Sequence, residues 1–285
     1  MKQIEITRFA SLFGVPNSTI DKDWVLGHLL NAIFGVHDKP GLLIFKGGTC
    51  LRKCWFQDYR FSEDLDFTLL DKRYPISDEW IKPILKKTGE LSGAKFQLES
   101  LTEQRWKDIP QGYLIDIKFW GADHHPNQKP LPSSRWQTHV HIDINYTEPL
   151  LENPVIMNIL HPYSDKELIT NQVVTYSFEE LFAEKIRTLQ QRNRPRDIYD
   201  VGMLCRHLKD TDLGLLAKLF IKKCQVKSLA FDNLSRFVNP KKERINQRHW
   251  DRALQYQVNR EKLPEFISFY QEVGNFIKTL IIQSK

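Results

Sequence analysis

Two aspartates, Asp64 and Asp66, alternate with Leu65 and Phe67 in the segment DLDF. In an extended strand, residues two apart project from the same side, so the two carboxylates should lie next to each other. Adjacent carboxylates repel unless a cation or a proton neutralises them. Ligand sets made only of oxygen atoms favour a hard cation, so the pair predicts a site for Mg2+.

A third aspartate, Asp143, stands in the segment THVHIDINY, residues 138–146. Its polar neighbours alternate with Val140, Ile142 and Ile144, which predicts a strand with one apolar and one polar face. If Asp143 faces the same cleft as the aspartate pair, three carboxylates could hold one or two Mg2+ ions against a triphosphate, as in nucleotidyl transfer. The alternative is ordinary: such aspartates are often solvated on an exposed sheet face.

A glycine pair precedes the aspartates in the segment FKGGTC. Backbone N–H groups at a glycine turn that opens a helix point outward and meet the positive end of the helix dipole, so the turn suits a phosphate group. Basic and hydroxyl side chains nearby would add to such a site. The predicted nucleotide-binding residues are Lys46, Gly47, Gly48, Thr49, Arg52 and Ser62.

A second polar cluster follows in the segment EELFAEKIRTLQQRNRPRDIYD, residues 179–200. Lys185 stands in a predicted helix, and Asp197 and Asp200 open the next one. Such charges are usually solvated helix faces, and an aspartate at a helix N-terminus is favoured by the helix dipole alone. The functional alternative is that a lysine and an aspartate from a second lobe bind triphosphate oxygens and orient an acceptor hydroxyl.

The elements that would carry these residues fall into two regions. Up to about residue 165, helical and strand patterns alternate, and beyond it the strand signals fade. Ser177 with Glu180 predicts a capping box, and Pro195 suits the first turn of the following helix. Strands are predicted near 42–45, 63–70, 96–101, 113–120 and 138–146, and helices near 21–35 (amphipathic), 77–91, 177–190, 212–224 and 262–282. We therefore predict an α/β fold, with a mixed-sheet lobe over residues 1–165 and an all-helical lobe over residues 166–285.

Composition places only mild limits on function. The 285 residues include 41 Lys and Arg against 35 Asp and Glu, a net charge of +6 that is compatible with phosphate-bearing partners. The N-terminus lacks the features of a signal peptide, and no apolar run reaches the roughly 20 residues of a membrane span, so we expect a cytoplasmic protein with no membrane partner. The four cysteines lack the spacing of a zinc site and are expected to be reduced thiols.

Taken together, these motifs resemble those of the AbiEii/AbiGii toxin family of nucleotidyltransferases, which includes the mycobacterial MenT toxins. The matching segments lie within about residues 21–208 and are, in chain order, FKGGTCLRK, RFSEDLDF, VHIDINY, LFAEKIRTLQQR and RDIYDV. The resemblance implies a polymerase-beta-like nucleotidyltransferase lobe, a helical lobe, Mg2+ and a nucleoside triphosphate. It also implies an RNA acceptor, in several members the 3′ end of tRNA, and a cognate antitoxin.

The resemblance also assigns roles position by position. It makes Asp64 and Asp66 the metal-binding pair, Asp143 the third carboxylate, and Lys185 with Asp197 the essential pair of the helical lobe. Ser62 matches a position that the antitoxin phosphorylates in some members. Two alternatives stay open: nucleotidyl or phosphoryl transfer to a protein or small molecule, and a catalytically silent module that binds RNA or an antitoxin.

A basic stretch, NPKKERINQRHWDR at residues 239–252, gathers five positive side chains around Trp250. In a functional interpretation, the basic side chains contact RNA phosphates while Trp250 stacks on a base. A solvated basic loop and helix explains the same pattern equally well.

Overall fold

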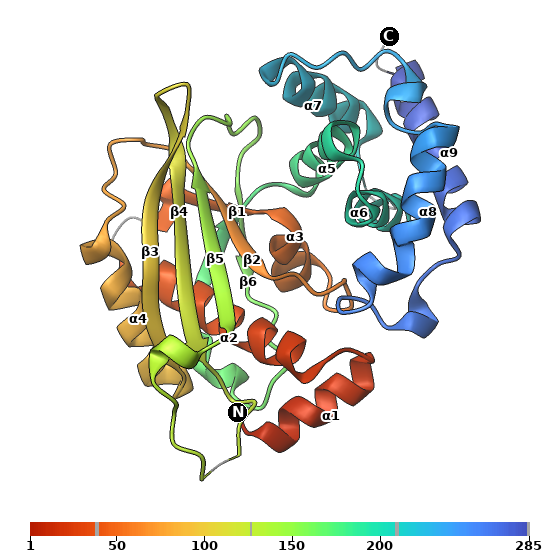
Figure 1. Cartoon of the computed structure of the whole chain (residues 1–285). Helices are drawn as coiled ribbons and strands as arrows, with labels where there is room; N and C mark the ends of the chain where they lie inside the picture. The colour runs from red at the N-terminus through yellow and green to blue at the C-terminus, as the bar shows by residue number, and fades with distance from the viewer. Residues whose placement is uncertain (38–39, 126, 209–210, 284–285) are drawn as a thin grey trace. The chain divides into compact units, whose positions relative to one another are not determined.

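The structure, a computed structural model, describes residues 1–37, 40–125, 127–208 and 211–283, which form two compact units (Figure 1). The N-terminal unit comprises residues 1–150 and 154–176, and the C-terminal unit comprises residues 151–153 and the chain from residue 177 onward. The units therefore divide after residue 176 and not at the predicted residue 165, because β7 (Gln172–Thr175) still belongs to the sheet of the N-terminal unit.

A mixed sheet forms the centre of the N-terminal unit, and its strand order among the described residues is β3-β4-β5-β2-β1-β7-β6 (Figure 1). β2 runs parallel to β5 and β1 runs parallel to β7, whereas the other neighbours are antiparallel. The remaining strands are β1 (Leu43–Lys46), β2 (Asp64–Leu69), β3 (Lys95–Trp106), β4 (Ile109–Trp120), β5 (Thr138–Asn145) and β6 (Val155–Asn158). The predicted α/β class with a mixed sheet is confirmed.

Two helices cover the apolar face of the sheet. Helices α2 (Asn17–Val36) and α4 (Asp78–Ser92) pack against each other, and each contacts strands. Phe34 of α2 meets Phe67 of β2 with ring centroids 6.2 Å apart. The predicted amphipathic character of α2 is wrong. Its side chains are buried almost continuously from Ile20 to Phe34, because α1 (Gln3–Phe13), α4 and strands of the sheet all contact it.

The strand predictions hold where the sequence offers a long alternating pattern. β5 follows the pattern along the strand, with Val140, Ile142 and Ile144 completely buried. β2 follows it from Asp64 to Phe67 and then departs from it, because Thr68 is buried as well. β6 and β7 have only four residues each, too few for a period of two to stand out, and the prediction that strands end before residue 165 is wrong for β7.

The C-terminal unit is helical throughout its described part, as predicted. Its helices are α5 (Phe178–Arg192), α6 (Pro195–Cys205), α7 (Leu213–Val226), α8 (Pro240–Leu254) and α9 (Phe266–Gln283). The hydroxyl of Ser177 accepts the Glu180 backbone N–H at 3.2 Å and caps α5. The reciprocal half of the capping box is not made, because the Glu180 carboxylate instead accepts backbone N–H groups of residues 151 and 152 and pairs with Lys223 at 2.7 Å. Pro195 occupies the first turn of α6, as expected.

Membrane insertion has no helical candidate in the described residues: no helix there joins the length and the apolar character that a bilayer crossing requires.

Candidate active site

The sheet register brings two of the predicted aspartates and a lysine into one row. Lys46 on β1 is the register partner of Asp66 on β2, and Asp66 is the register partner of Asp143 on β5. Side chains at paired positions of neighbouring strands project from the same face. Asp64 lies two residues from Asp66, and therefore on the same face, with His141 as its partner on β5. We call Lys46, Asp64, Asp66 and Asp143 the carboxylate row.

The carboxylate row occupies the sheet face opposite the core. Leu65 and Phe67, which alternate with the two aspartates on β2, are completely buried, whereas Asp64 is exposed and Asp66 is half-buried. Asp143 is exposed between buried neighbours on β5. The structure therefore brings the three predicted metal-binding aspartates to adjacent positions, and their role as metal ligands remains a prediction.

The glycine turn packs directly on the carboxylate row. Gly47 begins the short helix α3 (Gly47–Cys50) and has φ of +83°, a left-handed conformation that glycine adopts without strain. A Cβ atom at Gly47 would lie only 2.1 Å from Oδ2 of Asp66. A Cβ atom at Gly48 would lie 3.0 Å from Nη2 of Arg60 and from Oγ of Ser62. Both glycines thus allow close approach, the first of a carboxylate and the second of a guanidinium and a hydroxyl.

Two of the predicted nucleotide-binding side chains are instead used inside the fold. Thr49 is completely buried, and its hydroxyl donates to the backbone carbonyl of Asp64. Arg52 is only 3% exposed, and its Nε donates to Oδ1 of Asp23 at 2.7 Å. Its guanidinium also stacks on the Phe61 ring, 3.5 Å from the centroid. The predicted contact of Arg52 with a nucleotide is therefore corrected: this buried ion pair ties the residues after the glycine turn to α2.

Arg60 is a site residue that the sequence analysis missed. It is buried, its Nη1 donates to the Phe61 carbonyl at 3.1 Å, and its Nη2 lies beside Gly48. The sequence does contain a pattern that predicts this position. Arg60, Ser62, Asp64 and Asp66 follow one another at intervals of two, which places their side chains on one side of an extended chain.

The electrostatics of the row are dominated by acidic groups. Nζ of Lys46 lies 3.3 Å from Oε2 of Glu148, a second group that the sequence analysis missed, and both side chains are buried. Although much of the Asp143 side chain is exposed, desolvation of its carboxyl group raises its pKa, Lys46 opposes this shift, and the charge of Asp64 adds to it. A bound divalent cation would relieve this repulsion.

The donor atoms of the row fit a hard divalent ion. All three candidate ligands are aspartate oxygens, and the described cluster contains no sulfur ligand that would favour a softer metal. Gly47 leaves room for the Asp66 carboxylate where any side chain would displace it. The residues present therefore fit Mg2+.

Lys185 and Asp197 lie in the C-terminal unit. Nζ of Lys185 pairs with Oδ2 of Asp200 at 2.8 Å. Asp197 is buried, and its Oδ2 accepts the Arg194 backbone N–H at 3.1 Å at the start of α6. Its Oδ1 accepts Nη2 of Arg192 at 2.8 Å. The helix-start interpretation of Asp197 is thus realised, and a catalytic role for Lys185 and Asp197 remains a prediction.

The basic stretch of residues 239–252 forms most of α8. Trp250 is 3% exposed, its Nε1 donates to the Pro264 carbonyl at 3.0 Å, and its ring packs against Phe266 and Phe269. The predicted stacking of Trp250 on a base is therefore wrong, because the ring belongs to the core of the C-terminal unit. Arg244 and Arg248 are exposed on the same helix, so phosphate contacts remain open to them.

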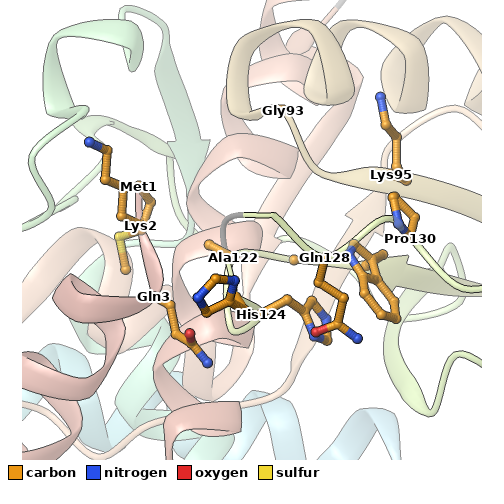
Figure 2. A pocket seen from close by; sticks show the side chains of 12 residues that line it. Met1, Lys2, Gln3, Gly93, Lys95, Ala122, His124, Gln128 and Pro130 are labelled. Atoms are coloured by element: carbon orange, nitrogen blue, oxygen red, sulfur yellow. The ribbon is translucent and has the colours of Figure 1, made fainter.

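A pocket of about 290 Å³ lies elsewhere in the N-terminal unit, where β4 ends at Trp120 (Figure 2). Figure 2 shows Lys2 and Lys95 on opposite sides of it. The Trp120 ring stacks on the His124 ring with centroids 3.5 Å apart. None of the predicted catalytic or nucleotide-binding residues lines this pocket. We therefore assign the candidate active site to the carboxylate row and not to the pocket.

Comparison with known proteins bears on the fold and on the family of the chain. No curated protein matches the chain. Among solved structures, the fold is similar to that of MenT4, a nucleotidyltransferase toxin from Mycobacterium tuberculosis H37Rv, with a TM-score of 0.57 and 17% sequence identity over 100% of this chain and 99% of that one. Residues 28–272 match the family model described as nucleotidyl transferase AbiEii toxin, type IV TA system. The chain therefore belongs to the AbiEii family of nucleotidyltransferase toxins of type IV toxin–antitoxin systems.

Proposed function

We propose that the chain transfers a nucleotide from a nucleoside triphosphate to an RNA acceptor such as the 3′ end of a tRNA, with Mg2+ held by Asp64, Asp66 and Asp143. The observation that carries the proposal is the sheet register that aligns Lys46, Asp66 and Asp143, with Gly47 closed against the Asp66 carboxylate. Family membership supplies the reaction class. The metal, the acceptor and the residue roles are what we add.

Mg2+ would neutralise the triphosphate and stabilise negative charge that develops during transfer. The chain's own part is to hold three carboxylates ready on rigid strands. β1 and β2 pair over four positions that end at Lys46 and Asp66, and β2 and β5 pair over five positions that begin at Asp64 and His141. This pairing fixes the spacing of the carboxylates before any ligand arrives. Such preorganisation is worth more than the same groups on a mobile loop.

The triphosphate would lie along the glycine turn. Lys46 and Arg60 are buried as Arg52 is, but Lys46 directly precedes Gly47 and Nη2 of Arg60 lies beside Gly48, so with Ser62 they would supply positive charge and a hydroxyl donor at the turn. An arginine is well suited to phosphate because its planar guanidinium donates two parallel hydrogen bonds. Ser62 in this position also supports a regulatory proposal: a phosphate group on its hydroxyl would compete with the triphosphate for the same positive groups.

Asp143 is our candidate for the base that accepts the proton of the acceptor hydroxyl. The hydroxyl oxygen would attack the α-phosphorus, pyrophosphate would leave, and the proton would pass to the carboxylate. Because bound Mg2+ would offset the electrostatic shift of the Asp143 pKa, this assignment rests on position: Asp143 is an exposed carboxylate directly opposite Asp66 in the sheet.

The C-terminal unit would contribute Lys185 and Asp197 to triphosphate and acceptor binding, and the exposed arginines of α8 to RNA phosphates. An antitoxin is the expected protein partner of a toxin in this family. The cytoplasmic location predicted from the sequence stays a prediction. Transfer to a protein or a small molecule is the alternative, whereas the intact carboxylate row argues against a silent binding module.

The test is to incubate the purified chain and Mg2+ with total bacterial RNA and each labelled nucleoside triphosphate in turn. We expect label in the RNA fraction, dependent on Mg2+, and sequencing of 3′ ends would name the acceptor. Label in protein or small molecules alone would favour the alternative acceptor class. No transfer from any triphosphate to any fraction would contradict the proposal.

A further inference from the structure

We propose that His28, His161 and Asp165 form a binding site for one divalent transition-metal ion, separate from the carboxylate row. His28 belongs to α2, whereas His161 and Asp165 belong to the segment between β6 and β7. One ligand atom from each residue lies within 4.8 Å of the others. The proposal goes beyond nucleotidyl transfer and does not depend on it.

Both imidazole rings direct the same nitrogen at the same carboxylate. Nε2 of His28 lies 3.1 Å from Oδ2 of Asp165, and Nε2 of His161 lies 3.0 Å from its Oδ1. Nε1 of Trp24 donates to Oδ2 at 2.8 Å, the kind of outer hydrogen bond that orients a ligating carboxylate. Two imidazoles with one carboxylate favour Zn2+, Co2+ or Ni2+, in contrast to the all-oxygen row that suits Mg2+.

The surroundings are built to hold the two rings in place. The His28 side chain is 0% exposed and the His161 side chain is 1% exposed. A Cβ atom at Gly27 would lie 2.3 Å from Nδ1 of His161, so glycine at this point of α2 lets the ring lie against the helix.

The competing interpretation is a hydrogen-bonded triad without metal. In it both Nε2–H groups donate to Asp165, which already accepts Trp24 and lies 3.5 Å from the N-terminal ammonium. Among the described residues, Nδ1 of His28 and Nδ1 of His161 are then buried without a partner. Within the part of the chain that the structure describes, these two Nδ1 atoms lack a partner with or without a bound ion, so they do not decide between the two interpretations. The metal interpretation rests on the convergence of two imidazoles and one carboxylate, whose ligand atoms lie within 4.8 Å of one another.

The decisive experiment is a titration of the metal-free full chain with Zn2+ by calorimetry and with Co2+ by visible absorption, both in saturating Mg2+. We expect one equivalent of Zn2+ to bind and to raise the melting temperature. Co2+ should develop the absorption of a nitrogen-ligated ion at the same stoichiometry. A double variant, Asp64→Asn with Asp66→Asn, should bind Zn2+ as the parent does, because it changes only the carboxylate row.

His28→Gln and His161→Gln are the informative variants, because glutamine still donates a hydrogen bond to Asp165 but lacks the imidazole ligand. Each variant should weaken Zn2+ binding by at least about 100-fold, because the loss of a residue that only hydrogen-bonds to a ligand costs about 10- to 100-fold and the loss of a ligand should cost more. His249→Gln, on an exposed position of α8, is the matched control and should bind as the parent does. Equal affinity in parent and both ring variants would overturn the proposal. If a ring variant fails to fold, the titrations of the parent protein decide the question. Absence of Zn2+ binding by calorimetry and of Co2+ absorption in the parent would overturn the proposal and leave the hydrogen-bonded triad.

Discussion

Gly47→Ala should impair the candidate active site through one carboxylate. Gly47 has φ of +83°, a region that costs an L-residue about 1–2 kcal/mol. The new Cβ atom would also stand 2.1 Å from Oδ2 of Asp66, too close for any real contact, so the carboxylate must move. A displacement on the order of 1 Å at a reacting centre can cost about 100-fold in rate, and we expect a loss of at least that size.

Gly93→Ala separates backbone strain from the clash. Gly93 ends α4 with φ of +79°, yet nothing lies within 4 Å of the position that a Cβ atom would take there. The variant should therefore lose about 1–2 kcal/mol of stability to urea and keep full transfer of labelled nucleotide. Gly47→Ala should lose stability and transfer together. Transfer at the parental rate in Gly47→Ala would refute the placement of the glycine turn against Asp66.

Three further predictions concern residues outside the row. Asp21 is 2% exposed, and desolvation raises its pKa to about 6, so its protonated form favours folding and that contribution is lost as pH rises through 6. Asp21→Asn should therefore stabilise the chain at pH 8, by up to about 3 kcal/mol for a pKa shift of roughly two units, and should have little effect on stability near pH 4. Urea titrations at the two pH values measure this difference. Equal destabilisation at both pH values would show that burial does not keep the Asp21 carboxyl group protonated. Trp250→Ala should cost about 3–5 kcal/mol as a core truncation, and a melting temperature unchanged from the parent would contradict its burial. Arg244, Arg248 and Arg252 are the exposed arginines of α8. Reversing their charge should reduce the slope of log RNA affinity against log salt concentration by about 0.7 for each lost single-strand phosphate contact, while triphosphate binding is kept. An unchanged slope would show that α8 does not contact the RNA.

The part of the site that could be predicted from the sequence is the part carried by local periodicity. Asp64, Asp66 and Asp143 alternate with apolar residues within single strands, and alternation fixes which face a side chain takes. The pairing of Asp66 with Asp143 could only be hypothesised, because β2 and β5 are parallel neighbours far apart in the chain and no local pattern encodes their register.

Long-range partners account for the errors. Arg52 looks like a phosphate ligand beside a glycine turn, but its partner Asp23 lies on another helix and draws it into the core. Trp250 has basic neighbours in sequence, yet Asn246, Trp250 and Leu254 share a helical spacing of four and form the buried face of α8. That spacing alone predicts a buried face, but the basic residues between these positions favoured the interpretation as an RNA-binding surface.

Binding of Mg2+ with a nucleoside triphosphate to Asp64→Asn and Asp66→Asn tests the central claim most directly. Each change keeps the size of the side chain and deletes one charge, so the exposed Asp64→Asn should stay within roughly 0.5 kcal/mol of the parent in metal-free melting. Asp66 is half-buried, so binding to Asp66→Asn is measured on protein whose metal-free melting shows that it is folded. If these carboxylates hold the metal, calorimetry should show triphosphate binding in Mg2+ weakened at least about 100-fold in either variant, with labelled transfer reduced by at least as much. Parental binding and parental transfer in both variants would contradict the account.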